Sequence, residues 1–166
     1  HWQNPSFFAY FPANTSYPSL LAEMISSALG AQCMKWETSP AATELEEAVM
    51  IWLRKMTGLP ASFTGVIQDT ASTATLCAIL SARERSTGHR INNEGFGNDP
   101  CLRIYCSLEA HSSVEKAVKI AGIGKKNLVK IECDAAYRMK PESLESAVQN
   151  DIKAGLKPMC VVAALG

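Results

Sequence analysis

The sequence lacks the features that mark several common classes of protein. No apolar run approaches the roughly 20 residues that a membrane-spanning helix needs. Its 16 Lys and Arg balance 16 Asp and Glu, so we expect neither nucleic acid nor an anionic membrane as a partner. The chain does not begin with Met, and no basic segment precedes an apolar one at its start. We therefore expect no signal peptide and a chain taken from within a longer one.

Cysteine is present, but not in a metal-binding pattern. No two cysteines form a C-x-x-C pair, and the three histidines do not fall at zinc-ligand spacing. We therefore predict no metal site. Most of the cysteines stand in apolar stretches, which indicates free, buried thiols in a reduced, cytoplasmic protein. The six are Cys33, Cys77, Cys101, Cys106, Cys133 and Cys160.

The hydrophobic pattern predicts helices first and a sheet later. Residues 1–17 are rich in aromatics and have no helical or strand period, so we expect an extended arm there. Helices are predicted over 18–29, closed by Gly30, and over 39–58. From residue 65 onward, strands and helices alternate. The predicted strands are 65–68, 102–107, 128–133 and 159–165, and the predicted helices are 70–86, 112–122 and 141–154.

Alternation of apolar strands with single crossover helices is typical of an α/β fold. It predicts a mainly parallel sheet with flanking helices. The polar, turn-rich stretch 87–100 is expected to be a surface loop. We expect residues 1–58 to form an N-terminal appendage of arm and helices, and residues 59–166 to form the first part of a larger α/β domain.

The turn after the first predicted strand is a candidate anion site. Residues 68–75 place four hydroxyl side chains at a strand-to-helix junction, where backbone N–H groups and hydroxyls can hold a phosphate. An ordinary N-cap by Ser or Thr is the alternative. Neither G-x-x-x-x-G-K-[ST] nor G-x-G-x-x-G occurs, which excludes a nucleotide P-loop and argues against a dinucleotide site.

The second candidate is His111, at the junction after strand 102–107. It is expected at the same edge of the sheet as the hydroxyl turn, where a histidine can stack on a flat ligand or transfer a proton. Its alternative is a histidine that only caps its helix. The stretch 112–115 (SSVE) reads as a capping box that opens this helix.

Four segments, in this order along the chain, resemble one known family. They are HWQNPSFFAYFPA, WETSPAATELE, GVIQDTASTATL and AHSSVEKA. The family is that of the group II pyridoxal-phosphate-dependent decarboxylases, and the similarity is greatest to aromatic-L-amino-acid decarboxylase and its relatives. The resemblance covers the whole chain. It implies the aspartate-aminotransferase-type fold (PLP fold type I), of which this chain is the N-terminal part.

The resemblance also implies roles for individual residues. Thr70, Ala71 and Ser72 match the positions that hold the phosphate of pyridoxal 5'-phosphate. His111 matches the catalytic histidine that stacks on the cofactor ring. The residues that match substrate-contacting positions are Tyr10, Phe11, Ala13, Gln32 and Met34. Three of them depart from the family pattern: Ala13 replaces a frequent Thr, and Gln32 and Met34 replace aromatic or branched residues.

One similar motif is rejected. The segment 133–137 (CDAAY) resembles the family motif whose aspartate pairs with the cofactor nitrogen, but Asp134 follows the third predicted strand, which is the wrong context. That aspartate and the lysine that binds the cofactor are expected beyond residue 166, so this chain alone is expected to be inactive.

The resemblance implies a homodimeric enzyme with shared active sites that converts an aromatic amino acid to amine and carbon dioxide. The cofactor accepts the electrons left when carbon dioxide departs. Two alternatives stay open. One is an oxidative aldehyde synthase on the same scaffold, against which His111 argues because such enzymes often carry Asn there. The other is a non-catalytic binding module.

Overall fold

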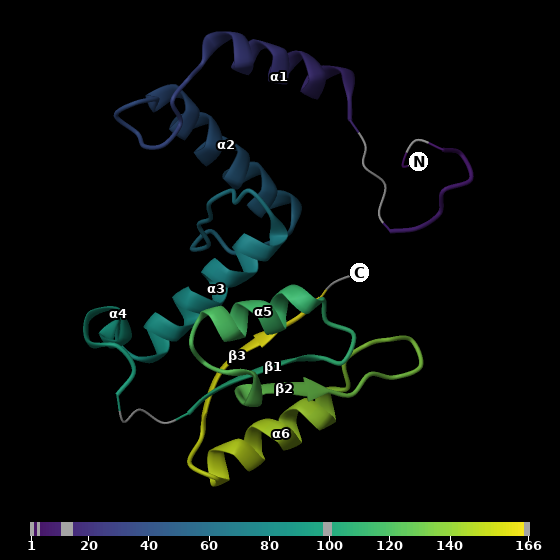
Figure 1. The fold of residues 1–166 in the computed structure, drawn as a ribbon, viewed down its shortest axis with the longest axis vertical. Coiled ribbons are helices and arrows are strands. Elements are labelled where there is room, and N and C mark those ends of the chain that lie inside the picture. Colours follow the sequence, from purple (N-terminus) through teal and green to yellow (C-terminus); the bar gives the residue numbers. More distant parts are fainter. Residues whose placement is uncertain (1, 3, 11–14, 98–100, 165–166) are drawn as a thin grey trace. The chain divides into compact units, whose positions relative to one another are not determined.

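The chain folds into two compact units, His1–Ile67 and Gln68–Gly166. The computed structural model describes residues 2, 4–10, 15–97 and 101–164. The first unit holds two helices and the second holds a sheet with helices on it (Figure 1).

The helices of the first unit begin and end as the sequence predicts. α1 (Tyr17–Leu29) starts with a capping box, in which the Ser16 hydroxyl accepts the N–H of Ser19 and the Ser19 hydroxyl accepts the N–H of Ser16. It ends at Gly30, whose φ of 59° is in the left-handed region that glycine adopts readily. α2 (Pro40–Met56) has Pro40 in its first turn, where a missing N–H costs nothing.

The first unit has no core of its own. None of its described residues is buried, and both helices leave most of their large apolar side chains exposed. Those of α1 are Leu20, Leu21, Met24, Ile25 and Leu29, and those of α2 include Leu45, Ile51, Trp52, Leu53 and Met56. Apolar surface of this extent normally marks a contact with another part of a protein.

The second unit is built on a three-stranded parallel sheet. β1 (Leu102–Ser107) lies in the middle, between β2 (Leu128–Ile131) and β3 (Lys157–Val162). Crossovers between the parallel strands run through helices, as parallel pairing requires. The helices and the short 3₁₀ helix are α3 (Ala71–Ser86), α4 (Arg90–Glu94), α5 (Ser112–Ile120), η1 (Lys125–Asn127) and α6 (Pro141–Lys153).

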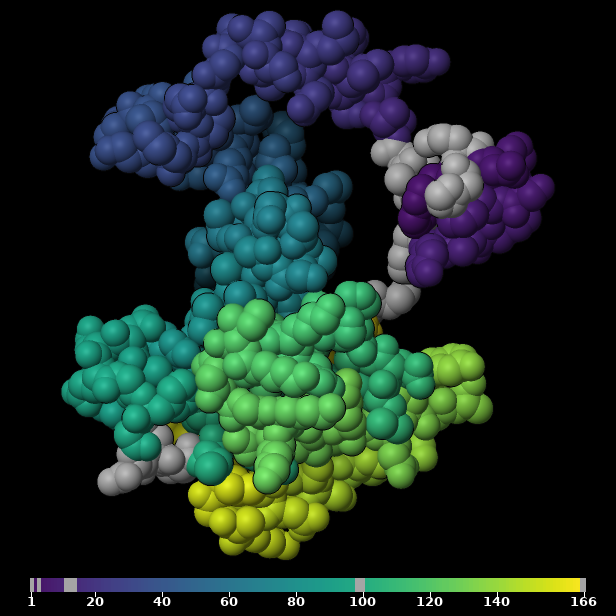
Figure 2. All heavy atoms as spheres, in the orientation of Figure 1, coloured from purple at the N-terminus to yellow at the C-terminus, as the bar shows by residue number. Residues whose placement is uncertain are grey.

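Helices cover both faces of this sheet, and its strands are almost hidden between α5 and α6 in the space-filling view (Figures 1 and 2). On one face, Ile104 packs with Ile79 of α3 and Val118 of α5 in the main core. On the other face, Tyr105 contacts Asp151 of α6. The alternation of side chains along β1 therefore serves two layers, which is the predicted α/β arrangement.

Two predicted elements are wrong. Residues 65–68 form no strand: Val66 and Ile67 are exposed, and the N–H of Ile67 donates to the carboxylate of Glu46 at 2.8 Å. The predicted loop 87–100 contains the helix α4, which Ile91 anchors because its side chain is buried in the core.

The cysteine prediction is confirmed in part. All six thiols are free, but only Cys106 is buried, and Cys33 and Cys101 are exposed. Burial raises the pKa of the Cys106 thiol, although nearby Lys130 acts in the opposite direction. Among the described residues, no helix combines the length and the apolar character needed to cross a membrane.

Candidate functional site

The N-terminus of α3 offers unpaired backbone donors. Thr70 is the N-cap, and its hydroxyl accepts the N–H of Thr73 at 3.2 Å. The N–H of Ala74 donates to the Thr70 carbonyl at 3.0 Å. Within the described part of the chain, the N–H groups of Ala71 and Ser72 have no such partner, and both residues are exposed. Two N–H groups at the positive end of a 16-residue helix thus stay available to an anion.

Three of the four hydroxyls of this turn form hydrogen bonds within the turn, and the fourth is available to a ligand. Thr70 and Thr73 hydroxyls are 3.1 Å apart, and the Thr75 hydroxyl donates to the carbonyl of Ala71 at 2.8 Å. The Ser72 hydroxyl has no hydrogen bond to another described residue. The capping interpretation of Thr70 is therefore confirmed, and it leaves Ser72 and the neighbouring N–H groups free. These groups fit a phosphate, which takes several donors at once.

His111 lies at the end of the segment that connects β1 to α5. It is the N-cap of α5, and its Nδ1 accepts the N–H of Ser113 at 3.2 Å. The predicted capping box is wrong, because Glu115 pairs instead with Lys119 and Lys125 at 2.7 and 3.2 Å. These two lysines hold the pKa of the Glu115 carboxyl below its usual range. The capping interpretation of His111 is thus confirmed as geometry, but it occupies only one ring nitrogen.

The two junctions lie at the same edge of the sheet. Near the far end of α3, Arg83 donates to the carbonyl of Ala121 at the end of α5 at 2.8 Å, so the two helices run in the same direction. Lys157, at the start of β3, donates to the carbonyl of Ser86 at the end of α3. The beginnings of α3 and α5 therefore face the carboxyl edge of the strands, where parallel sheets collect ligands (Figure 1).

The predicted substrate residues belong to the unit His1–Ile67. Tyr10 is exposed, has a φ of 63° and lies with its ring 5.7 Å from that of Trp2. Gln32 and Met34 are exposed in the segment between α1 and α2. Phe11 and Ala13 lie outside the described residues. The structure thus brings Thr70, Ala71, Ser72 and His111 to one sheet edge.

Both carboxylate oxygens of Asp134 accept hydrogen bonds from its own loop. One carboxylate oxygen accepts the N–H groups of Ala136 and Arg138, both at 2.9 Å, and the other accepts the Arg138 guanidinium at 2.8 Å. These bonds lower the pKa of the Asp134 carboxyl. The loop is closed by an antiparallel bridge between Cys133 and Met139. Asp134 therefore has a local structural role, consistent with its rejection as a cofactor ligand.

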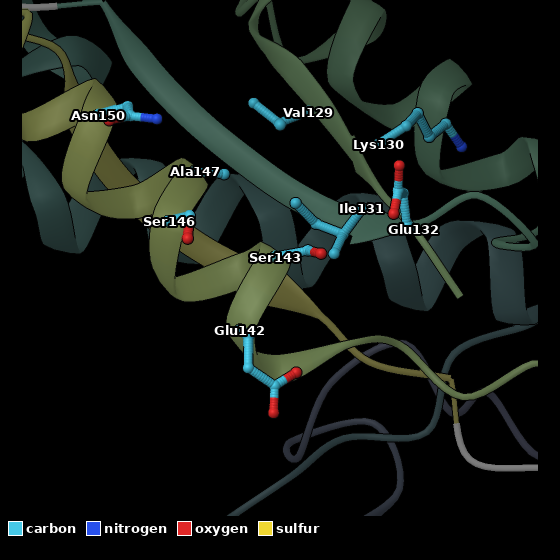
Figure 3. A pocket seen from close by; sticks show the side chains of 9 residues that line it. All are labelled: Val129, Lys130, Ile131, Glu132, Glu142, Ser143, Ser146, Ala147 and Asn150. Atoms are coloured by element: carbon cyan, nitrogen blue, oxygen red, sulfur yellow. The ribbon is translucent and has the colours of Figure 1, made fainter. Parts of the chain in front are cut away.

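The groove between β2 and α6 contains none of these site residues. It is open to solvent, and residues of the strand side and of the helix line it (Figure 3). They are Val129, Lys130, Ile131 and Glu132 on the strand side, and Glu142, Ser143, Ser146, Ala147 and Asn150 on the helix. No cluster of His, Cys, Asp and Glu in the described residues could hold a metal ion.

Ser113 is a residue that the sequence reasoning missed as part of the site. It is buried, and its hydroxyl lies 2.9 Å from Nδ1 of His111. The sequence signal for this contact is a serine two positions after a histidine at the end of a strand. The capping-box prediction for 112–115 gives this serine no contact with the histidine.

Comparison with known proteins places this arrangement in a family. Residues 1–166 match the pyridoxal-dependent decarboxylase conserved domain. Aromatic-L-amino-acid decarboxylase of Bos taurus is 43% identical over 180 residues, which cover 100% of this chain and 36% of that protein. Phenylacetaldehyde synthase of Arabidopsis thaliana is 42% identical over 174 residues, 100% of this chain and 35% of that protein.

A solved structure gives the same result. The crystal structure of Catharanthus roseus tryptophan decarboxylase in complex with L-tryptophan matches 99% of this chain and 35% of that one, with a TM-score of 0.88 and 38% identity. The chain therefore spans about a third of the length of the relatives that it matches.

Proposed function

Because this chain belongs to the pyridoxal-dependent decarboxylase family, we propose that the whole protein removes the α-carboxyl group of an aromatic L-amino acid. The products are carbon dioxide and the corresponding amine. The observation that carries this proposal is the match of all 166 residues to decarboxylases of aromatic amino acids, with His111 and the free donors of Ala71 and Ser72 at one sheet edge.

The cofactor of this family is pyridoxal phosphate, which when bound supplies an electron sink for the pair released as carbon dioxide leaves. We assign its phosphate to the start of α3. The N–H groups of Ala71 and Ser72 and the hydroxyls of Thr70 and Ser72 would bind it, and the helix dipole adds to their attraction. Of these groups, the two N–H groups and the Ser72 hydroxyl have no other hydrogen bond in the described part of the chain, whereas the Thr70 hydroxyl also caps α3.

We assign the ring of His111 to the face of the cofactor. Its Nδ1 is held by Ser113, so its Nε2 and its flat faces are left for the cofactor and substrate. A flat side chain there excludes water from one side of the reacting centre, and Nε2 can hold a proton close to it.

We assign the substrate's aromatic side chain to a pocket to which Tyr10, Phe11, Ala13, Gln32 and Met34 contribute. The support is the family resemblance of their positions. Tyr10, Gln32 and Met34 are exposed, so their side chains are available for such contacts. The departures at Ala13, Gln32 and Met34 bear on which aromatic amino acid is preferred.

We further propose a cytoplasmic homodimer. The unit His1–Ile67 exposes most of the apolar side chains of both its helices, which supports a partner subunit that covers them. Six free thiols support a reducing compartment.

An aldehyde synthase is the second candidate. Phenylacetaldehyde synthase of Arabidopsis thaliana is 42% identical to this chain, against 43% for the bovine decarboxylase, so overall identity does not separate the two. His111 favours the decarboxylase, because aldehyde synthases often carry Asn at that position.

The deciding experiment uses the full-length protein with pyridoxal phosphate. Carbon dioxide and ammonia are measured together with tyrosine, tryptophan and phenylalanine, and leucine serves as the aliphatic control. Carbon dioxide without ammonia is expected. Equal amounts of both would replace the decarboxylase with the synthase, and no carbon dioxide from any aromatic amino acid would contradict both.

A further inference from the structure

Ser113 makes two contacts with a single atom of His111. Its backbone N–H lies 3.2 Å from Nδ1, and its hydroxyl oxygen lies 2.9 Å from the same nitrogen. A backbone N–H only donates, so Nδ1 must accept and carries no proton. The neutral ring therefore has its proton on Nε2. The contact with Ser113 selects this tautomer.

The position of Ser113 is fixed more firmly than that of His111. Ser113 is 8% exposed, while His111 is exposed. The following residues of α5, Val114, Ala117 and Val118, are all buried. The first turn of α5 is thus anchored on the core, and Ser113 transmits that position to the ring of an exposed histidine.

The hydroxyl of Ser113 has no other partner. Among the described residues its only hydrogen-bond contact is Nδ1 of His111. A buried hydroxyl without a partner is unfavourable by about 1–3 kcal/mol, so the hydroxyl and the ring hold each other. The backbone N–H alone would leave the ring free to tilt about a single long contact.

We propose that Ser113 is a positioning residue for the reaction: its hydroxyl fixes the ring orientation of His111, while its backbone N–H keeps the proton on Nε2. This inference rests on the proposed function, because it assumes that His111 faces the cofactor and the substrate. Ser113 touches neither and acts only through His111.

The experiment compares four forms of the full-length enzyme with bound pyridoxal phosphate. They are the wild type, Ser113→Ala, Ser113→Thr and Ser81→Ala. Thr keeps a hydroxyl at the same position. Ser81 is the matched control, because its hydroxyl also makes one short hydrogen bond, 2.8 Å to the carbonyl of Cys77, but inside α3. The readouts are the visible circular dichroism of the bound cofactor and the ratio of ammonia to carbon dioxide.

The expected result is specific to the hydroxyl. Ser113→Ala should change the cofactor's dichroic band, lower carbon dioxide release about 10-fold to 100-fold and raise the ammonia ratio, since misplacement of a group near a reacting centre by about 1 Å has effects of that order. Ser113→Thr and Ser81→Ala should match the wild type in both readouts.

Two results would overturn the proposal. One is a Ser113→Ala enzyme with the dichroism and product ratio of the wild type. The other is a Ser113→Thr enzyme as altered as Ser113→Ala, because then the hydroxyl is not the cause. If Ser113→Ala does not fold, Ser113→Cys replaces it in the same comparison. A wild type that binds no cofactor or releases no carbon dioxide contradicts the proposed function instead.

Discussion

The hydroxyl of Tyr105 donates to Oδ2 of Asp151 across 2.7 Å and joins the middle strand of the sheet to α6. Arg103 donates to the same oxygen at 3.0 Å. Burial raises the pKa of Asp151, but the hydrogen bonds from Arg103 and Tyr105 outweigh it and hold that pKa below its usual range. Burial and the Asp151 carboxylate together raise the pKa of Tyr105. The pair is a buried polar link between two layers.

Removal of this link should destabilise the protein. Tyr105→Phe should lower the free energy of unfolding by about 1.5–3 kcal/mol, because it removes a hydrogen bond to a charged group. Denaturant unfolding of the full-length protein measures it. Tyr137→Phe is the control, since Tyr137 is exposed and its hydroxyl bonds to no other described residue. Equal stability of both variants would contradict the prediction.

The same link should depend on pH. The pKa of Asp151 is lower in the folded protein, so its contribution is complete above the unfolded value of about 3.9 and is lost as the pH falls through the folded-state pKa. The stability difference between wild type and Tyr105→Phe should therefore be constant from pH 7 to pH 5 and shrink in stronger acid. A difference that grows in acid would be inconsistent with an ionised Asp151.

Ser72→Ala should weaken the binding of pyridoxal phosphate about 10-fold to 100-fold. One charge-assisted hydrogen bond contributes about 1.5–3 kcal/mol, and the backbone N–H groups of residues 71 and 72, which the substitution leaves in place, keep part of the affinity. Titration of the full-length apoenzyme with the cofactor measures this. Ser81→Ala serves as control. An unchanged dissociation constant would remove Ser72 from the phosphate site.

His111→Asn should lower carbon dioxide release by about 10²–10⁴-fold and raise the share of ammonia, because the flat ring and its proton are lost. Asn is a good N-cap, so α5 should keep its cap and the variant should unfold at nearly the wild-type temperature. His111→Ala should lose both the ring and the cap, and with the cap about 1 kcal/mol of stability. Normal turnover in His111→Asn would make His111 a capping residue only.

Deletion of residues 1–17 should impair dimer formation. Phe8, Tyr10 and Tyr17 are each at least 85% exposed, and exposed aromatics of this kind are typical of interfaces. Light scattering and activity measurements on the full-length enzyme without residues 1–17 test this, and Phe8→Ser serves as a milder variant. A deletion variant that remains a fully active dimer would exclude the arm from the interface.

The sequence predicted most of the helices and strands, but not the short helix α4. β1 was predicted to the residue, and the ends of α1 at Gly30 and α2 near Gly58 follow capping rules. The predicted strand 65–68 failed because β-propensity acts only where a neighbouring strand accepts the backbone groups, and Ile67 binds Glu46 instead. Pattern alone carries no information on that neighbour.

The site was predicted less completely. The edge position of Thr70–Ser72 and His111 followed from alternation of strands and helices, which places helix N-termini at strand ends. The N-cap residue of α5 could not be predicted from the sequence. Ser112 and His111 are adjacent, and only packing decides which of them precedes the first helical residue. The buried contact of Ser113 depends on the same one-residue shift.

The strand order has a consequence for synthesis on the ribosome. Of the three described strands, the middle one, β1, is made first; β2 follows after α5, and β3 follows after α6. Both edges of a nascent β1 are therefore unpaired until later residues emerge. Its side chains Ile104 and Tyr105, which are buried in the folded protein, stay exposed for the same time. Pairing that spans a whole crossover is slow, and unpaired strand edges associate with other chains. Translation that slows within α6 would keep the edge of β1 that pairs with β3 open for longer and leave the nascent chain dependent on chaperones.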